Sequence, residues 1–304
     1  MAPAPQVLPG GMKVLHLSDV HLAPVVPGRP PWHGGWRRLL AQVELKLMGR
    51  ARRYADAPEA LARILEDAAA LEVDHLVLSG DLTVLARDEE FALVADALGG
   101  LTDAPARLTV VPGNHDRYTP GSHRDRRFER HFAGLLTSDL PEYQVEGAFP
   151  LVRLVGETLA VVGLDSTRVP PFPGLAFGRV GEAQRDALAA LLDDPRLEGR
   201  SVLVTFHHAP YDHTGRPELF THGLHDADAV LDVCAARGVA AVLHGHVHHR
   251  YRRACPRTGV EIFGAGSSTM AGDEGYWLLE LEGGKVISAE ALAPTPAGDA
   301  VLAV

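Results

Sequence analysis

The sequence predicts an α/β fold in which strands and helices alternate along a single domain. The first observation is a series of short apolar runs of strand length, and the second is that stretches with apolar residues at three- and four-residue spacing lie between many of them. The third is a late pair of strand-like runs around Glu282-Gly283-Gly284, a pattern typical of a hairpin. The alternation predicts a layered architecture, and the hairpin predicts sheets that are mixed rather than purely parallel.

The expected elements follow one another from the N-terminus to the hairpin. The apolar runs that predict buried strands are Val14–Leu17, His75–Leu78, Leu108–Val111, Leu159–Leu164, Val202–Phe206, Ala240–Leu243 and Val260–Gly264. The amphipathic stretches that predict helices are Pro58–Ala70, Glu89–Leu98, Glu182–Leu192 and Asp226–Arg237. The hairpin strands are Tyr276–Leu281 and Lys285–Ala289.

The chain has no internal repeat and no long linker, which favours one domain over residues 12–290. The ends, residues 1–11 and 291–304, are rich in Pro, Gly and Ala, and we expect them to be flexible. Residues 24–56 do not fit a minimal core and are interpreted as an insertion. Residues 36–53 of this insertion are arginine-rich and have the pattern of a basic amphipathic helix. The charged face of such a helix is usually exposed to solvent. Alternatives are a lid or a peripheral membrane contact.

Composition narrows the class of protein. The 304 residues carry a formal net charge of -10, which argues against stable nucleic-acid binding but is compatible with a phosphate substrate, because bound cations invert the local field. Cys234 and Cys255 lie in unrelated contexts, which favours a reducing compartment. No apolar run approaches the roughly 18 residues of a membrane span, and the N-terminus lacks the pattern of a signal peptide. We therefore expect a cytoplasmic protein.

Five polar motifs each follow a strand-like run, at the end where ligands collect in α/β sheets. They are Ser18-Asp19-Val20-His21, Ser79-Gly80-Asp81, Gly113-Asn114-His115-Asp116, Phe206-His207-His208-Ala209-Pro210 and His244-Gly245-His246-Val247-His248. Carboxylate, amide and imidazole groups without a thiolate suit Mn²⁺, Fe or Zn²⁺. Two such ions, roughly 3.5–4 Å apart, can share a bridging hydroxide and bind both non-bridging oxygens of a phosphate. A single Asp or His after a strand is usually a cap or a surface residue, but five ordered motifs are not explained in that way.

These motifs resemble the five-block signature of the calcineurin-like metallophosphoesterases, which is Asp-x-His, Gly-Asp, Gly-Asn-His-Asp or Glu, His, and Gly-His-x-His. Every block is present in order between about Val14 and Ser268. The resemblance implies a four-layer α/β/β/α sandwich of two mixed sheets, with two metal ions at the carboxyl edges of the sheets. It also implies a hydrolase that acts on phosphoric esters.

The resemblance implies a role for each matching residue. Asp81 would bridge the two ions, His115 would stabilise or protonate the leaving group, and Asp116 would orient His115 or a neighbouring loop. Of the adjacent His207 and His208, the family pattern favours the first as the ligand, and His208 stays an alternative. The expected metal ligands are Asp19, His21, Asp81 and His248 for the first ion, and Asp81, Asn114, His207 and His246 for the second.

The most similar activity is that of bacterial phosphodiesterases, so we expect hydrolysis of a small phosphodiester, with a cyclic nucleotide or another nucleotide as a candidate substrate. One alternative is a phosphomonoesterase or pyrophosphatase that acts on a nucleotide or a lipid-linked nucleotide sugar. Another is a non-catalytic metal-binding scaffold. Phe172 and Phe177 are candidates to stack on a base or simply to pack, and the segment with His222 and His225 is a candidate to reach over the site. The sequence does not predict the oligomeric state.

Overall fold

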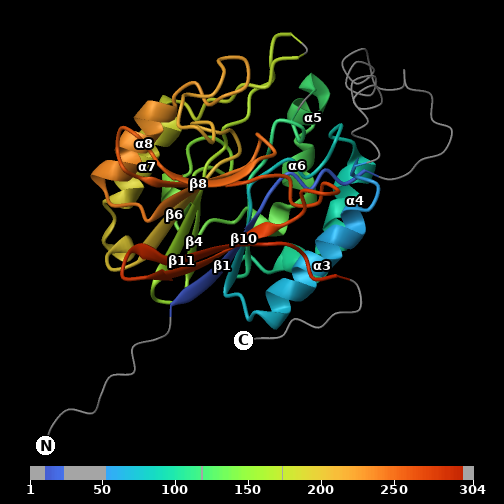
Figure 1. The fold of residues 1–304 in the computed structure, drawn as a ribbon. Helices are drawn as coiled ribbons and strands as arrows, with labels where there is room; N and C mark the ends of the chain where they lie inside the picture. The colour runs from blue at the N-terminus through green and yellow to red at the C-terminus, as the bar shows by residue number, and fades with distance from the viewer. Residues whose placement is uncertain (1–10, 24–52, 118, 173, 297–304) are drawn as a thin grey trace, which may run out of the picture.

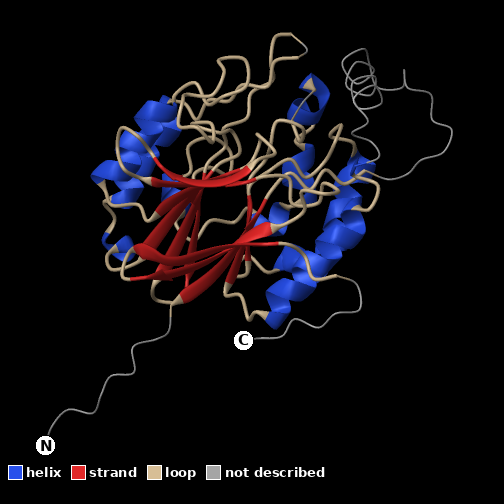
Figure 2. Cartoon of the chain, viewed as in Figure 1, coloured by secondary structure: helices blue, strands red, loops and turns tan. Residues whose placement is uncertain are grey.

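Two β-sheets lie face to face with helices on their outer sides, as expected for a four-layer sandwich (Figures 1 and 2). The computed structural model describes residues 11–23, 53–117, 119–172 and 174–296. The strands of both sheets run in mixed directions, which confirms the predicted α/β fold class. The expected strands and helices are all present, with boundaries that differ by at most three residues.

The first sheet has the order β11-β10-β1-β2-β3. Strands β1, β2 and β3 are parallel, and the hairpin of β10 and β11 adds antiparallel to β1, with Leu15 opposite Leu278. The hairpin is therefore the element that makes this sheet mixed. The bounds are β1 Met12–Leu17, β2 His75–Leu78, β3 Leu108–Val110, β10 Tyr276–Glu282 and β11 Lys285–Leu292.

The second sheet has the order β4-β5-β6-β7-β9-β8. Its four central strands are parallel, and the two edge strands β4 and β8 are antiparallel to their neighbours. Both edge strands were missed by the sequence pattern because charged residues interrupt their apolar character, as Arg153 does in β4. The bounds are β4 Leu151–Val155, β5 Leu159–Gly163, β6 Ser201–Thr205, β7 Ala241–His244, β8 Arg250–Ala254 and β9 Glu261–Ala265.

The helices cover the outer faces of the sheets, and apolar cores separate the layers. Helices α3 and α4 pack on the first sheet through residues such as Leu61 and Phe91, and α7 and α8 pack on the second through Leu188 and Leu231. A central core that includes Val77 joins the two sheets. The bounds are α3 Ala57–Ala70, α4 Asp88–Leu98, α5 Pro120–Arg124, α6 Arg127–His131, α7 Glu182–Leu192 and α8 Ala227–Ala236, with short 3₁₀ helices η1 Gly99–Asp103, η2 Ala133–Leu135, η3 Pro141–Tyr143 and η4 Pro195–Leu197.

The C-terminal segment is ordered further than the sequence predicts. Strand β11 pairs with β10 through Leu292, two residues into the segment expected to be flexible, because the register places Ala291 opposite Trp277. Beyond it, the Thr295 amide donates to Asp67 Oδ2 at 3.0 Å. Residues 1–10, 24–52 and 297–304 lie outside the described residues, and with them most of the expected insertion and of its basic helix.

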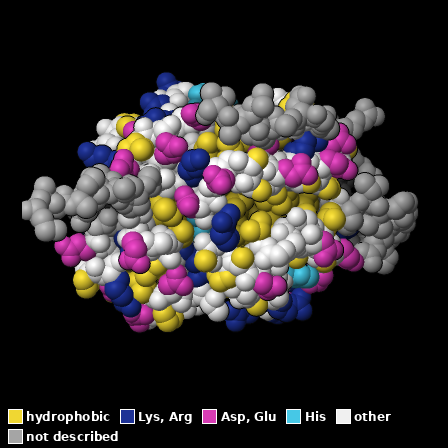
Figure 3. All heavy atoms as spheres, turned by 90° about the horizontal axis from the view of Figure 1, so that it is seen from below, with side chains coloured by type: hydrophobic (Ala, Val, Ile, Leu, Met, Phe, Trp, Pro, Cys, Tyr) yellow, Lys and Arg dark blue, Asp and Glu magenta, His cyan; other side chains and the backbone are white. Residues whose placement is uncertain are grey.

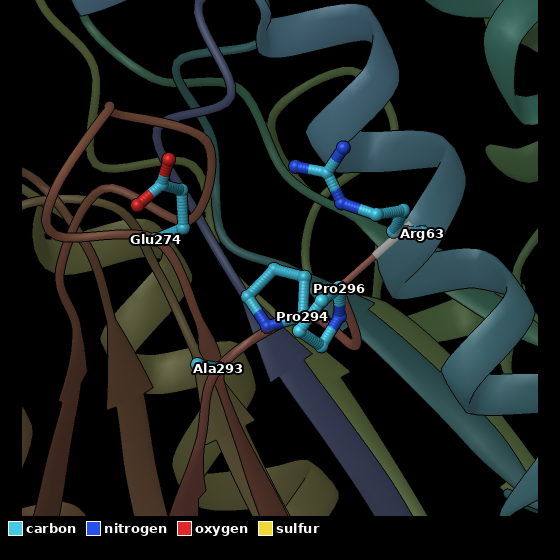
Figure 4. A pocket seen from close by; sticks show the side chains of 5 residues that line it. All are labelled: Arg63, Glu274, Ala293, Pro294 and Pro296. Atoms are coloured by element: carbon cyan, nitrogen blue, oxygen red, sulfur yellow. The ribbon is translucent and has the colours of Figure 1, made fainter. Parts of the chain in front are cut away.

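A pocket lies between α3 and the chain after β11, and Figure 4 shows its lining. It offers one cationic and one anionic side chain, and none of the five motifs contributes to it. The lining residues are Arg63, Glu274, Ala293, Pro294 and Pro296. The molecule seen from below the view of Figure 1 shows acidic and basic side chains interspersed around an apolar hollow (Figure 3). None of the helices described is both long and apolar enough to traverse a bilayer.

Candidate metal centre

The first group of ligand atoms brings together the first and last motifs. Asp19 Oδ1 lies 3.1 Å from His248 Nε2 and 3.7 Å from His21 Nε2. The two imidazole Nε2 atoms face each other at 3.2 Å. Residues that are 227 positions apart in sequence therefore converge because β1 and β7 end at the same edge of the two sheets.

The second group lies on the other side of Asp81. Asn114 Oδ1 is 3.0 Å from His207 Nε2 and 2.9 Å from His246 Nδ1. Asp81 Oδ2 is 3.4 Å from His207 Nε2 and 3.8 Å from His21 Nε2, so this one oxygen faces both groups. The other carboxylate oxygen, Oδ1, accepts the His115 amide hydrogen at 2.7 Å. Of the two carboxylate oxygens of Asp81, Oδ2 is therefore the one that would be available to a metal ion in either group.

The two adjacent histidines of the fourth motif point in different directions. His207 Nδ1 donates to the Ser79 carbonyl at 2.9 Å, which directs Nε2 toward Asp81 and Asn114. His208 instead contacts Ser166 Oγ through Nδ1 at 2.8 Å. The structure therefore brings His207, and not His208, to the two groups of ligand atoms.

The backbone at these positions is conformationally costly. Left-handed φ angles occur at five of the seven expected ligands, a conformation that costs about 1–3 kcal/mol each for residues other than glycine. The second and third motif loops also approach each other so closely that glycine is strongly favoured at residue 113. A Cβ on Gly113 would lie 2.1 Å from the Asp81 amide nitrogen. The five ligands are Asp19 (φ 52°), His21 (46°), Asp81 (54°), His246 (75°) and His248 (51°).

The electrostatics of the cluster produce ionised carboxylates and largely neutral imidazoles. Burial opposes ionisation of Asp81, but the nearby His207 and His115 hold its pKa well below its usual value. Burial lowers the pKa of His21, and burial together with His207 lowers that of His246 to about 3. Burial also opposes a charge on His207, yet the carboxylates of Asp81 and Asp19 raise its pKa to about 9. The carboxylates therefore attract positive charge, and neutral imidazoles offer the lone pairs that a metal ion binds.

The residues present fit metal ions on direct observation. The oxygen and nitrogen atoms of Asp19, His21 and His248 lie within 4.8 Å of one another, and so do those of Asp19, Asp81 and His207. Asp19 Oδ1 is buried and, within the described part of the chain, lacks a hydrogen bond of good geometry. His21 Nδ1 donates to the Thr83 carbonyl at 3.2 Å, so the lone pair of its Nε2 faces His248 Nε2, an arrangement that a cation between them would stabilise.

Comparison with known proteins identifies the family. The model of the calcineurin-like phosphoesterases matches residues 12–250. The chain belongs to the calcineurin-like phosphoesterase family. The resemblance in the five motifs is thus confirmed, and with it the expectation of a metal-dependent phosphoesterase at the level of the family.

Solved structures share the fold of this calcineurin-like phosphoesterase at low sequence identity. A dimetal phosphatase from Danio rerio has a TM-score of 0.64 and 15% identity, with 94% of this chain and 100% of that chain covered. A purple acid phosphatase from yellow lupin (Lupinus luteus) seeds has a TM-score of 0.54 and 13% identity, with 89% of this chain and 49% of that chain covered. A comparison with curated proteins finds no match.

The third motif of the family also positions His115 and Asp116. His115 Nδ1 donates to the Val84 carbonyl at 2.8 Å, and its ring meets that of His21 edge-on at 5.0 Å. Asp116 does not contact the His115 ring through a described hydrogen bond. Its carboxylate accepts the amides of Gly113, Leu82 and Thr83 and the Thr83 hydroxyl, and so ties the second and third motif loops together. Of the two roles expected for Asp116, the geometry favours the support of a neighbouring loop.

Sequence reasoning missed two further residues beside the first ligand group. Tyr54 places its ring edge-on to His21 at 4.9 Å, and its hydroxyl lies 3.2 Å from Ser267 Oγ and 3.5 Å from His248 Nδ1. Ser267 in turn donates to the Asp19 carbonyl at 2.7 Å. Neither residue belongs to one of the five motifs, so only the folded structure reveals their position.

Proposed function

We propose that the protein is a phosphodiesterase that hydrolyses a small, nucleotide-type phosphodiester at a dinuclear metal centre. Asp19, His21 and His248 would hold one ion, Asn114, His207 and His246 the other, and Asp81 would bridge them. The observation that carries this assignment is the position of Asp81 Oδ2 between His21 Nε2 and His207 Nε2, at 3.8 and 3.4 Å. Two bound ions would supply Lewis acidity toward the phosphate and lower the pKa of water.

The charge of the site supports a diester rather than a monoester. The hydrogen bonds and ion pairs described for the seven ligand side chains come from carboxylates, imidazoles, hydroxyls and backbone groups, and none from an Arg or Lys side chain. The nearby Arg117 is paired with Glu129 at 2.9 Å and with Asp165 at 3.3 Å. A monoester carries nearly one more negative charge than a diester near pH 7, and within the described residues no Arg or Lys side chain is bonded to the ligand side chains to meet that charge.

We assign the leaving-group side of the reaction to His115. Because its Nδ1 hydrogen is given to the Val84 carbonyl, Nε2 would hold the second proton of the imidazolium form and deliver it to the departing alkoxide, which leaves a neutral ring. The bond from the His115 amide to Asp81 Oδ1 fixes this residue relative to the proposed bridge. One hydrogen bond between the second and third motif loops thus joins the proposed acid to the proposed bridging carboxylate.

Turnover of two aryl phosphates tests this function directly. Metal-free protein is refilled with Mn²⁺, Fe²⁺ or Zn²⁺, and kcat/KM is measured for bis(p-nitrophenyl) phosphate and for p-nitrophenyl phosphate. We expect metal-dependent hydrolysis with preference for the diester. Asp81→Asn should abolish it, whereas the surface variant Asp193→Asn, which changes charge in the same way, should not.

The remaining outcomes separate the other two candidates. Preference for the monoester would replace the proposal with a phosphomonoesterase. The absence of turnover with every metal, despite two bound ions, would replace it with a metal-binding scaffold.

A further inference from the structure

Three aromatic rings form a continuous stack in the loops after β5 and β6. The His225 ring lies parallel to Phe177, with centroids 4.4 Å apart and an interplanar angle of 11°, and parallel to Phe220 on its other face, at 4.1 Å and 13°. His225 Nε2 also bonds the Phe220 carbonyl at 2.7 Å. We call these three residues the ring stack.

A short ribbon of backbone holds the ring stack in place. The Ala176 amide donates to the Thr221 carbonyl at 2.9 Å, and the Gly178 amide donates to the Gly223 carbonyl at 3.0 Å. The His225 amide returns a bond to the Gly178 carbonyl at 2.9 Å. Two loops that lie about 45 residues apart in sequence are thereby paired like strands, so the stack has a fixed orientation.

This ribbon borders the candidate metal centre. The His222 ring centroid lies 6.3 Å from that of the expected ligand His246. Gly178 packs so tightly on His208 that a Cβ there would lie 2.3 Å from the imidazole. In Figure 1, the yellow to orange loops after β5 and β6 rise above the upper ends of the strands, on the side where the motifs lie.

The outer end of the ring stack is open to solvent. Phe220 is 78% exposed and the adjacent Leu219 is 68% exposed, whereas the other large apolar side chains of this loop are buried. An exposed aromatic ring held parallel to two others presents a flat face on which a further ring can stack. Such a surface is of little use for the phosphate itself, because phosphate offers no apolar face.

We propose that Phe220 is the platform for a planar heterocycle of the substrate, so that the ester hydrolysed at the metal centre belongs to a nucleoside. The inference rests on the proposed function for the position of the phosphate. In this arrangement the ring stack selects the substrate, and the metal centre hydrolyses the ester. Phe177, which the sequence pattern singled out, lies at the end of the stack opposite Phe220, so it would support the stack rather than contact the nucleobase.

Binding measured without turnover tests the platform. Calorimetry on the Mn²⁺-loaded protein compares adenosine 5′-monophosphate with ribose 5-phosphate, which lacks the base. We expect the parent to bind the nucleotide more tightly than ribose 5-phosphate. In Phe220→Ala, the ratio of the two affinities should fall by about tenfold. Phe220→Leu keeps an apolar side chain but removes the flat ring, so it should lose most of the preference, and Phe220→Trp should retain it. Ile287→Ala, at another exposed apolar residue, should behave as the parent.

Kinetics with two diesters separate this inference from the proposed function. Thymidine 5′-(p-nitrophenyl phosphate) and methyl p-nitrophenyl phosphate share a leaving group and differ in the nucleoside. We expect the parent to prefer the first in kcat/KM, and Phe220→Leu to reduce only that preference. Equal kcat/KM for the two diesters, or equal affinity for the two monophosphates, would overturn the platform and leave the diesterase intact. Nucleotide preference in binding without any diester turnover would overturn the diesterase and leave the platform.

Discussion

The candidate metal centre and the ring stack lie side by side, but they are built in opposite ways. The metal centre collects buried side chains from five loops, and Asp19 and His207 are fully buried. The ring stack is built from two paired loops, and its terminal Phe220 is largely exposed. The centre depends on contacts among five loops of both sheets, whereas the stack depends on the pairing of only two loops. A change of substrate can therefore occur at the stack without disturbing the centre.

The two regions also differ in what they cost the folded state. The centre gathers carboxylates, which burial disfavours, and residues in left-handed backbone conformations. The ring stack is stabilised by its own parallel contacts and by the ribbon. We therefore expect variants at the centre to change metal binding and turnover severely, and variants at the stack to change selectivity alone.

The largest effect is expected at the proposed bridge. Asp81→Asn removes one negative charge from the oxygen that faces both ligand groups, so turnover should fall to the level of the metal-free protein. Metal analysis of the purified variant should show fewer than two ions per chain. A variant that kept two ions and normal turnover would remove Asp81 from the centre.

The next effect is expected at His115. His115→Ala should lower kcat by about 10²–10⁴-fold, the contribution typical of a positioned acid or base, and leave the metal content unchanged. Loss of metal instead of rate would place His115 among the ligands. His123→Ala, on helix α5, serves as a matched histidine outside the centre and should retain the parental kcat.

Close packing of the motif loops predicts a smaller effect on stability. Gly113→Ala would place a Cβ 2.1 Å from the Asp81 amide nitrogen, so the unfolding free energy should fall by about 1–3 kcal/mol, as overpacking usually costs. Gly100→Ala meets no atom within 4 Å and is the control. Urea unfolding of both variants measures the difference, and equal stabilities would show that the loops yield without strain.

A buried histidine outside the centre predicts the pH dependence of the fold. Burial lowers the pKa of His75 to about 4 from the ordinary histidine value of 6.5, although its Nδ1 bond to the Ala106 carbonyl opposes that shift. As the pH falls, the unfolded chain binds a proton at His75 before the folded protein does. The free energy of unfolding is therefore undiminished by His75 above about pH 6.5, and this group lowers it by about 2 kcal/mol at pH 5. His75→Gln should lose less stability than the parent between pH 7 and pH 5 in urea unfolding. An identical loss in both proteins would assign the acid sensitivity to other groups.

The sequence predicted the centre better than its surroundings because the motifs are local. Asp19, Asp81 and His207 each follow an apolar strand, and parallel strands bring their ends to one edge without further information. The family pattern favoured His207 over His208, and the contacts of the two rings with Ser79 and Ser166 agree with that preference.

Edge strands and long-range neighbours were less predictable. Strand β8 carries three arginines, and β4 carries Arg153, so neither shows the apolar pattern of a central strand. Helices α5 and α6 have five residues each, too few for a helical period to emerge. Tyr54 and the ribbon that holds the ring stack depend on pairings across distant loops, for which the sequence carries no local signal.

A titration of metal into the metal-free protein tests the central claim most directly. Diester turnover and bound Mn²⁺ are followed together as the metal is added. If Asp81 joins two ions in one centre, turnover should stay low until the second equivalent binds and reach its maximum at two ions per chain. Full turnover at one ion per chain, or none at two, would contradict a dinuclear phosphodiesterase.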